Sequence, residues 1–281
     1  KNSSVNLKNG FKDFKDLSNI FLDFTNKLGA LKKKKYVVAV SGGPDSLALA
    51  ALTKAYSFSN KVKFFYVLID HNIRKNSYQE AQKVKKILKK KNISLKVFSN
   101  KKTIVKNFQA EARNSRYDIL VKYCKKNKVK VLLTAHNFED QVETFLIRLS
   151  RGSGLRGLSA MKPISKINGQ ISLYRPLLEI KKKFLIKISK NTFGTYIKDP
   201  SNVSQKFLRT KIRNLKRPLE KSGIKYEKIF KSIENLSSSS KTIDGFLNKI
   251  FTELINKKNK EIFINFKKYK NLNKDIKIAL I

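Results

Sequence analysis

Short apolar runs rich in β-branched and aromatic residues recur through the first half of the chain. Four have the length and composition of buried strands: residues 36–40 (YVVAV), 62–70 (VKFFYVLID), 94–98 (SLKVF) and 129–135 (VKVLLTA). Continuous apolar runs bounded by turn-forming residues are typical of strands that are covered on both faces. The pattern therefore predicts four core strands.

Between these runs the apolar residues change to helical spacing. Residues 45–57, 77–91 and 107–127 have the length and pattern of helices. The second carries an apolar stripe, with lysines elsewhere around the helix: Ala81, Val84, Ile87 and Leu88. Strands that alternate with helices predict an α/β fold, a doubly wound and mostly parallel sheet.

The regular alternation ends after about residue 150. Residues 151–161 (RGSGLRGLSAM) form a glycine-bearing loop, residues 198–205 (KDPSNVSQ) form a turn cluster, and the chain from about residue 205 is helical and strongly basic. We expect three parts: a helical lead-in over 1–34, a main domain over 35–215, and a small, basic, helical C-terminal appendage over 216–281.

The charge of the chain is far from balanced. Its 281 residues include 63 Lys+Arg and 20 Asp+Glu, a formal net charge of +43. A surplus of this size favours a polyanionic partner, most simply nucleic acid. The alternative is a lysine-biased genome, because only ten of the 63 basic residues are arginines. The 41% hydrophobic content predicts a packed core.

Cysteine usage and the termini narrow the class of protein. Cys124 is the only cysteine, which excludes a disulfide framework and a Cys-x-x-Cys zinc site and suits a reducing cytoplasm. The sequence contains no apolar signal-peptide core and no run of 18 apolar residues, so we expect no membrane partner. It begins at Lys1 without Met and ends on KIALI, so we expect an excised or truncated chain.

The stretch SGGPDS, residues 41–46, forms the corner between the first predicted strand and the helix after it. Gly42 and Gly43 permit positive φ and let a ligand approach without Cβ in the way. Loop amides and a helix N-terminus together bind phosphate. No Lys follows the glycines, so this is not a Walker A loop. A tight turn whose helix is capped by Asp45 or Ser46 is the alternative.

The complete string SGGPDS after a strand resembles the pyrophosphate loop of the N-type ATP pyrophosphatases, the PP-loop superfamily. The resemblance implies an adenine nucleotide alpha hydrolase-like fold, with ATP and Mg²⁺ as cofactors. It makes residues 35–215 a PP-loop catalytic domain and assigns six residues to ATP and its pyrophosphate: Ser41, Gly42, Gly43, Pro44, Asp45 and Ser46.

Further segments resemble one member of that superfamily, the tRNA(Ile)-lysidine synthetases. The resemblance spans roughly residues 36–220 and is most specific over residues 134–161, where TAHNFEDQVETFLIRLSRGSGLRGLSAM follows the family pattern almost position for position. The other matching segments are VLIDHNIR (67–74), EARNSRY (111–117), RPLLEIKK (175–182), DPSN (199–202) and RTKIRNLKRPL (209–219). Thr210 departs from the family, which usually has Asn after the residue equivalent to Arg209.

This resemblance implies an ATP-dependent ligase that forms a carbon–nitrogen bond. It would adenylate the wobble cytidine of tRNA(Ile) with a CAU anticodon and join free L-lysine to it. The products would be lysidine, AMP and pyrophosphate, and decoding would change from Met (AUG) to Ile (AUA). The alternative is another PP-loop tRNA-modifying or amide-forming enzyme. Thiolases of this type generally need paired cysteines, which this chain lacks. A non-enzymatic RNA-binding protein is the rival from another class.

Two carboxylates follow the fourth predicted strand. Asn137 is a good N-cap, so a helix is expected to start there, with Asp140 and Glu143 on one face of its first two turns. One reading is an Asn137–Asp140 capping arrangement, with Glu143 complementing the helix dipole. The other is a site for Mg²⁺ or a substrate amine, and the family resemblance favours it. Asp45 and Asp140 would then hold Mg²⁺, and Glu143 would orient the lysine amine or take its proton.

The resemblance also implies roles for other charged residues. Arg113 would contact the triphosphate or the activated base. His136 would act on the substrate, and Asp70 and His71 would contact the nucleotide. The two histidines are the only ones in the chain, and a hydrogen-bonded structural role is the alternative for both. Four arginines are expected to bind tRNA: Arg151, Arg156, Arg209 and Arg213. We expect a cytoplasmic protein, and both a monomer and a homodimer stay open.

Overall fold

The computed structural model describes residues 15–70, 76–99, 108–197, 208–258 and 261–280. They divide into two compact units. Unit 1 comprises the residues up to Glu143 and Met161–Arg213, and unit 2 comprises Thr144–Ala160 and the residues from Asn214 onwards. The expected domain boundaries stay a prediction. No helix among the described residues is long and apolar enough to cross a lipid bilayer.

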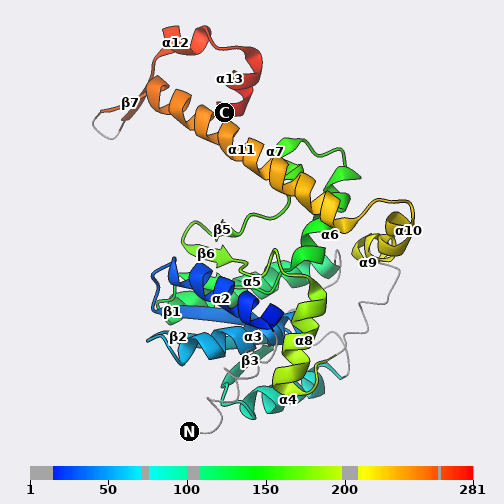
Figure 1. Ribbon diagram of the computed structural model, residues 1–281. Coiled ribbons are helices and arrows are strands. Elements are labelled where there is room, and N and C mark those ends of the chain that lie inside the picture. The colour runs from blue at the N-terminus through cyan, green and yellow to red at the C-terminus, as the bar shows by residue number, and fades with distance from the viewer. Residues whose placement is uncertain (1–14, 71–75, 100–107, 198–207, 259–260, 281) are drawn as a thin grey trace. The chain divides into compact units, whose positions relative to one another are not determined.

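A six-stranded sheet forms the centre of unit 1. Its strands are β1 (Lys35–Val40), β2 (Lys63–Asp70), β3 (Leu95–Ser99), β4 (Val131–Leu133), β5 (Ile164–Ile167) and β6 (Ile171–Tyr174). They lie in the order β3-β2-β1-β4-β6-β5 (Figure 1). Every neighbouring pair is parallel except the edge pair of β5 and β6. The prediction of a mostly parallel α/β sheet is confirmed.

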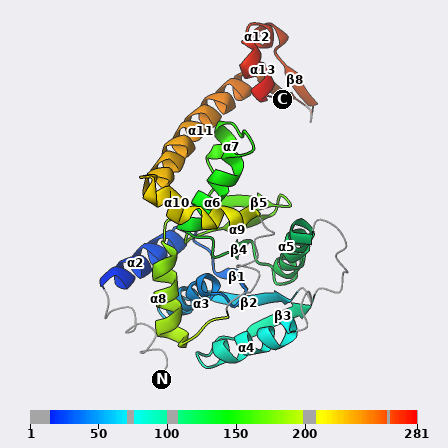
Figure 2. The same ribbon diagram turned by 90° about the vertical axis from the view of Figure 1, so that its right-hand side faces the viewer.

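Helices cover both faces of this sheet. The helices that begin in unit 1 are α2 (Lys15–Gly29), α3 (Pro44–Ser57), α4 (Ser77–Lys89), α5 (Phe108–Lys126), α6 (Phe138–Leu149), α8 (Lys182–Phe193) and α9 (Leu208–Asn214). Side chains alternate along β1, so Val38 belongs to the core cluster that includes residues of α2, α3, α4 and α8, whereas Val37 belongs to the cluster that includes residues of α5. Figure 2 shows α5 on the side of the sheet opposite to α3 and α8. Burial on both faces explains why the strands are almost continuously apolar.

The β5–β6 hairpin is absent from the predicted strands. Asn168, Gly169 and Gln170 join the two strands, and Asn168 and Gly169 have φ values of 48° and 68°, a left-handed conformation that Asn and Gly adopt more readily than other residues. Asn-Gly between short β-branched segments is the sequence signal for such a hairpin. The strands themselves are only four residues long each, so their alternation is too brief to predict them without the turn.

Unit 2 is mainly helical. Its elements are α7 (Leu155–Leu158), α10 (Lys216–Lys221), α11 (Tyr226–Leu254), β7 (Ile255–Lys258), β8 (Glu261–Ile264), α12 (Phe266–Lys270) and α13 (Lys274–Leu280). The helical C-terminal region is confirmed, but its extent needs correction, because β7 and β8 form an antiparallel hairpin. The glycine-bearing segment also belongs to this unit, where Ser159 Oγ donates to the carbonyl of Leu236 in α11 at 3.3 Å.

Candidate functional site

The strand order reverses between β1 and β4, two neighbours from which the chain continues in opposite directions across the sheet. In open α/β sheets ligands bind outside the carboxyl ends of the strands at such a switch point. The loop of residues 41–46 follows β1, and His136 and Asn137 follow β4. The structure thus brings the two most informative sequence segments to the same edge of the sheet.

The 41–46 loop is closed by the hydroxyl of Ser46. Ser46 Oγ accepts the backbone N–H groups of Ser41 and Gly42, each at 3.1 Å, and donates to the carbonyl of Gly43 at 3.0 Å. Gly43 is the N-cap of α3, Pro44 is its first residue, and no side chain caps the helix. The alternative in which Asp45 or Ser46 caps α3 is therefore wrong. An uncapped helix N-terminus keeps amide donors and a positive dipole end for an anion.

The two glycines of the loop serve different purposes. Gly42 has φ +85°, and a Cβ there would lie 2.5 Å from Val84 Cγ2, so this residue must be glycine for the loop to pack. Gly43 has φ −71° and ψ 165°, so the expectation of positive φ at this residue is wrong. A Cβ at Gly43 would approach no described atom more closely than Ser41 Oγ, at 3.8 Å. That side of the loop is open to a ligand.

Asp45 lies in the first turn of α3 and faces the residues after β4. Burial raises its pKa to about 6; the ammonium of Lys182 and a hydrogen bond with the Asn137 side chain oppose the rise, and the charge of Asp140 adds to it. Asp45 Oδ2 lies 3.6 Å from Lys182 Nζ. Among the described residues, no group donates a hydrogen bond to the buried Oδ1. A carboxylate oxygen with this surrounding is suited to a cation.

Asn137 and Asp140 form a reciprocal cap at the start of α6. Asp140 Oδ2 accepts the N–H of Asn137 at 3.1 Å, and Asn137 Oδ1 accepts the N–H of Asp140 at 3.0 Å. The capping arrangement considered from the sequence is thus present. The other oxygen of Asp140 accepts from Arg209 Nη2 at 3.1 Å. The cap fixes Asp140 beside Asp45, and its role towards a ligand stays a prediction.

Glu143 is the most deeply buried carboxylate of this helix, with a side chain only 2% exposed. Arg213 Nε donates to Oε1 at 2.8 Å and Arg213 Nη2 donates to Oε2 at 3.1 Å. Arg209 Nε donates to Oε2 at 2.8 Å. The two arginines are one helical turn apart on α9, so they attach α9 to α6. In this conformation their guanidinium groups face carboxylates, and their contact with tRNA stays a prediction.

His136 is a neutral side chain in this environment. Its Nδ1 lies 3.0 Å from Thr134 Oγ1. Burial, followed by the charges of Arg175, Arg113 and Arg209, lowers its pKa to about 3. At neutral pH the ring can therefore donate or accept a hydrogen bond but supplies no positive charge.

The remaining residues predicted to bind the nucleotide or tRNA differ in how far they are exposed to solvent. Arg113 is exposed, with its guanidinium 5.2 Å from the centre of the Tyr117 ring. Asp70 ends β2 and is 4% exposed. Arg151 is exposed, and Arg156 pairs with Asp244 of unit 2 at 3.1 Å. His71 lies outside the described residues.

Several residues that sequence reasoning did not select are also positioned here. Glu139 Oε2 accepts the N–H of Lys182 at 2.8 Å. Gln141 pairs with the backbone of Met161 through two hydrogen bonds, at 2.8 and 2.9 Å. In unit 2, Arg148 Nη1 donates to the carbonyls of Gly157 and Ala160, both at 2.7 Å. These residues lie inside the segments that match the family, but sequence gives no sign of which backbone atoms they reach.

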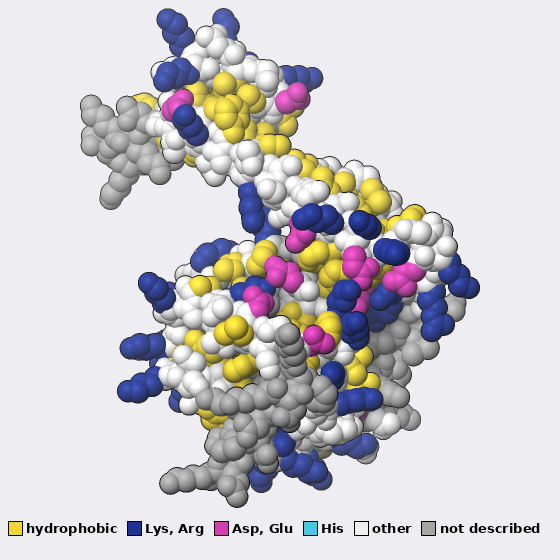
Figure 3. Space-filling view, in the orientation of Figure 1, with side chains coloured by type: hydrophobic (Ala, Val, Ile, Leu, Met, Phe, Trp, Pro, Cys, Tyr) yellow, Lys and Arg dark blue, Asp and Glu magenta, His cyan; other side chains and the backbone are white. Residues whose placement is uncertain are grey.

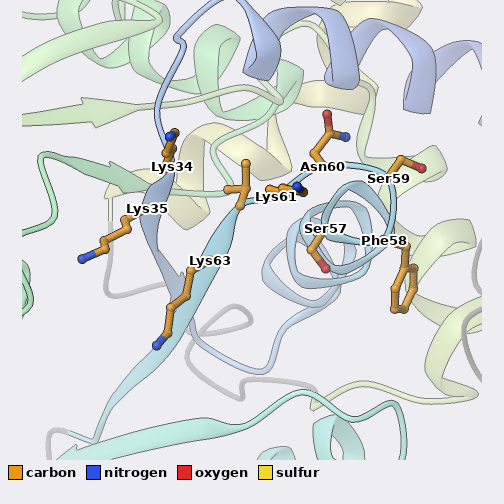
Figure 4. Close-up of a pocket in the computed structure, with 9 residues that line it drawn as sticks. Lys34, Lys35, Ser57, Phe58, Ser59, Asn60, Lys61 and Lys63 are labelled. Carbon is orange, nitrogen blue, oxygen red and sulfur yellow. The ribbon is translucent and has the colours of Figure 1, made fainter.

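A hollow away from the switch point lies at the amino ends of β1 and β2 (Figure 4). It measures about 630 Å³ and is lined by Lys34, Lys35, Ser57, Phe58, Ser59, Asn60, Lys61, Val62 and Lys63. In Figure 4 the side chains of Lys34, Lys35 and Lys63 do not converge on a common point. This hollow therefore lacks the organised donors of the switch point. Within the described parts of the chain, no three Asp, Glu, His or Cys side chains lie close enough together to hold a metal ion as a group.

Comparison with known proteins places this geometry in a family. Residues 15–219 match the family model of the PP-loop domain. The chain is 35% identical over 244 residues to the tRNA(Ile)-lysidine synthase of Wolbachia pipientis wMel, covering 86% of this chain and 56% of that protein. It is 39% identical over 204 residues to the tRNA(Ile)-lysidine synthase of Orientia tsutsugamushi (strain Boryong), covering 70% and 45%. The chain thus spans about half the length of the curated relatives it matches.

A solved structure supports the fold. The U34-tRNA thiolase NcsA from Methanococcus maripaludis, with its [4Fe-4S] cluster, matches with a TM-score of 0.65 at 19% identity, covering 79% of this chain and 78% of that chain. At this identity the likeness shows the fold alone.

Cys124 of the present chain is buried in the core, and burial raises the pKa of its thiol to about 12. The SGGPDS loop lies at the switch point of the sheet. Because the family model covers most of the chain, this chain belongs to the PP-loop domain family.

Proposed function

We propose that this chain carries the catalytic part of a tRNA(Ile)-lysidine synthetase. It adenylates the wobble cytidine of a tRNA(Ile) with a CAU anticodon and then joins free L-lysine to that base. Identities of 35% and 39% to two synthases of this name support the proposal. The observation that carries it is the meeting of the 41–46 loop with the carboxylate-bearing start of α6 at one switch point.

ATP is assigned to the loop after β1. The phosphates lie against Gly43 and the uncapped first turn of α3, where a side chain would otherwise stand. The hydroxyl of Ser46 accepts hydrogen bonds from the amides of Ser41 and Gly42, so both N–H groups point towards the same oxygen. A phosphate oxygen would compete for these two amides, and Ser46 therefore keeps the loop in a conformation that suits an anion.

Mg²⁺ is assigned to Asp45 and Asp140. The buried Oδ1 of Asp45, which accepts no hydrogen bond from the described residues, fits a hard cation that prefers oxygen ligands. Each Asp140 oxygen already accepts a hydrogen bond, from Asn137 or from Arg209, and would offer its second lone pair to the ion. Mg²⁺ usually takes one or two carboxylates together with substrate phosphates, so a pair suffices. The ion would supply neutralisation of the charge on the departing pyrophosphate.

The reaction takes place in two steps. The carbonyl oxygen on carbon 2 of cytidine attacks the α-phosphorus of ATP; the bond to the bridging oxygen breaks, and pyrophosphate leaves. The amine nitrogen of lysine then attacks carbon 2, the bond from that carbon to oxygen breaks, and AMP leaves with the oxygen while the amine loses a proton. Adenylation is needed because a carbonyl oxygen is a poor leaving group.

Further roles are assigned to residues of α5 and α6 and to residues at the ends of β4 and β2. Arg113 contacts the phosphate or the activated base. The neutral ring of His136 forms a hydrogen bond with the substrate. Glu143 orients the lysine amine or takes its proton. Arg209 and Arg213 donate to both Glu143 oxygens, so the incoming amine either shares Oε1 with Arg213 Nε or replaces an arginine contact. Asp70, at the end of β2, and His71 contact the nucleotide.

The tRNA is assigned to the basic surface. Figure 3 shows Lys and Arg side chains over both units, with far fewer Asp and Glu side chains. Arg151 and Arg156 bring positive charge to the glycine-bearing segment, and Arg209 and Arg213 do so on α9. Phosphate contacts of this kind give binding that weakens by about 0.7–0.9 log units per log[salt] for each phosphate neutralised. A flat salt response would contradict a tRNA-binding surface.

The cytoplasm is the proposed location, since the single cysteine suits a reducing compartment.

Incorporation of radiolabelled lysine into a tRNA(Ile) transcript with a CAU anticodon tests the proposal. Labelling is expected to require ATP, to be lost in Asp45→Ala, and to persist in Asp23→Ala, an exposed carboxylate on α2. Turnover of ATP to AMP without lysine labelling would keep the PP-loop assignment and reject lysidine formation.

A further inference from the structure

Three consecutive lysines occur where α8 begins, and their side chains go to different places. Lys181 Nζ lies 5.8 Å from the centre of the Phe138 ring, and Lys183 Nζ lies 5.0 Å from that of Phe184. Lys182 Nζ lies 3.6 Å from Asp45 Oδ2, at the PP-loop. The middle lysine is therefore the one that the backbone directs to the switch point.

The backbone at this position is fixed by α6. The N–H of Lys182 donates to Glu139 Oε2 at 2.8 Å, and the N–H of Phe138 donates to the carbonyl of Ile180 at 3.1 Å. Two hydrogen bonds in opposite directions thus attach the turn before α8 to the first turn of α6. Since α6 starts at the switch point, these two hydrogen bonds hold Lys182 beside the 41–46 loop.

The loop itself has amides but no cation. Its only charged residue is Asp45, which is negative when ionised and repels a polyphosphate. Walker A loops place a lysine in the loop to meet the phosphates, and residues 41–46 contain none. Besides the Mg²⁺ assigned to Asp45 and Asp140, a basic side chain from another element would offset the repulsion between Asp45 and the triphosphate of ATP.

The separation between Lys182 and Asp45 leaves the ammonium available to a ligand. At 3.6 Å the contact is an attraction between charges and exceeds the length of a hydrogen bond, about 2.7–3.2 Å. An ammonium has three N–H donors, and at this distance Asp45 takes up none of them. The Lys182 side chain is 34% exposed, so it reaches the solvent from which ATP arrives.

We propose that Lys182 binds the polyphosphate of ATP through its ammonium group and keeps hold of pyrophosphate after the α-phosphate has been attacked. Lys182 thereby supplies, from the start of α8, the cation that the 41–46 loop lacks. The inference rests on the proposed binding of ATP at that loop. It assigns Lys182 to the β- and γ-phosphates, because the α-phosphate must stay open to the attacking base.

Dissociation constants of the intact chain for ATP, inorganic pyrophosphate and AMP, measured by titration calorimetry with Mg²⁺ present, test this role. Lys182→Met is expected to weaken ATP and pyrophosphate about 10- to 100-fold, the range for hydrogen bonds to charged groups, and to leave AMP unchanged. Lys182→Arg should restore most of the affinity. Lys183→Met, the same change one residue along on an exposed side chain, should bind all three as the unchanged chain does.

The outcomes separate this proposal from the proposed function. Equal weakening of ATP and AMP in Lys182→Met would mean a structural role and would overturn the inference, as would unaltered ATP binding. If the variant loses ATP and pyrophosphate selectively but the unchanged chain forms no lysidine, the inference stands and the lysidine assignment fails. If the unchanged chain binds neither ATP nor pyrophosphate, both fail.

Discussion

Arg213 and Glu143 form a forked pair in which two guanidinium nitrogens each bind a different carboxylate oxygen, at 2.8 and 3.1 Å. The carboxylate is 2% exposed, whereas the guanidinium side chain is 32% exposed. Paired geometry of this kind is stronger than a single contact and is specific to arginine. The pair holds α9 against α6, which also carries Asp140 and so belongs to the candidate site.

Glu143→Gln is expected to lower the free energy of unfolding by about 2–3 kcal/mol. It leaves Arg209 and Arg213 beside a neutral amide, and losing one partner of a buried ion pair costs about 3–5 kcal/mol, reduced here because both arginines are about one-third exposed. Urea unfolding monitored by circular dichroism measures the change.

The matched control is Asp244→Asn, which removes the carboxylate of the more exposed Arg156 pair. It should change the free energy of unfolding by about 0.5 kcal/mol or less. Equal effects of the two variants would show that burial of Glu143 adds nothing to the pair.

The two loop glycines should respond differently to alanine. Gly42→Ala places a Cβ 2.5 Å from Val84 Cγ2 at a φ of +85°, so it should destabilise the fold by about 2–4 kcal/mol. Gly43→Ala meets no atom closer than 3.8 Å and should leave the free energy of unfolding within about 0.5 kcal/mol. Unfolding in urea and calorimetric titration with ATP distinguish them: Gly43→Ala should fold normally and bind ATP more weakly. Normal ATP binding by Gly43→Ala would place the phosphates elsewhere.

Asp45 should make the chain less stable as pH rises from about 4 to 6. Its pKa in the folded chain is raised to about 6, chiefly by burial, from an ordinary value of 3.8. The folded state therefore binds the proton more tightly than the unfolded state, and ionisation opposes folding. Asp45→Asn should be more stable at pH 7 by about 1–2 kcal/mol, with the loss of its attraction to Lys182 included.

The measurement is the difference in unfolding free energy between the unchanged chain and Asp45→Asn at pH 4, 5, 6 and 7. Groups common to both chains cancel in this difference. The gain should vanish near pH 4. A gain that does not depend on pH would mean that Asp45 has an ordinary pKa in the folded chain.

His136 should lower the free energy of unfolding as pH falls, whereas Asp45 lowers it as pH rises. Its pKa in the folded chain is lowered to about 3, first by burial and then by neighbouring arginines, from 6.5. Below pH 6.5 the unfolded chain takes up a proton that the folded chain refuses, so stability falls as pH falls. At pH 5 the unchanged chain should have lost about 2 kcal/mol relative to His136→Asn. Thermal melts of both chains at pH 7 and pH 5 test this, and parallel curves would contradict a buried, neutral imidazole.

Much of the fold follows from local patterns. Continuous apolar strands alternating with amphipathic helices predict a parallel sheet, since only strands covered on both faces are apolar throughout. The sequence pattern missed the β5–β6 hairpin, whose strands are short, and the β7–β8 hairpin in a region with helical character. Short antiparallel pairs depend on contacts between neighbouring strands and turns more than on intrinsic preference.

The sequence by itself determined the family, the position of the 41–46 loop after β1, and the start of α6 next to Asn137. These are local features, because a loop string and an N-cap act within a few residues. Only the tertiary structure decided that Arg209 and Arg213 face Glu143, that Gly42 is required for packing, and that Lys182 meets Asp45. Each depends on side chains from elements far apart in the chain. Their approach is set by the strand order and by the turns that fix each helix, which no local pattern encodes.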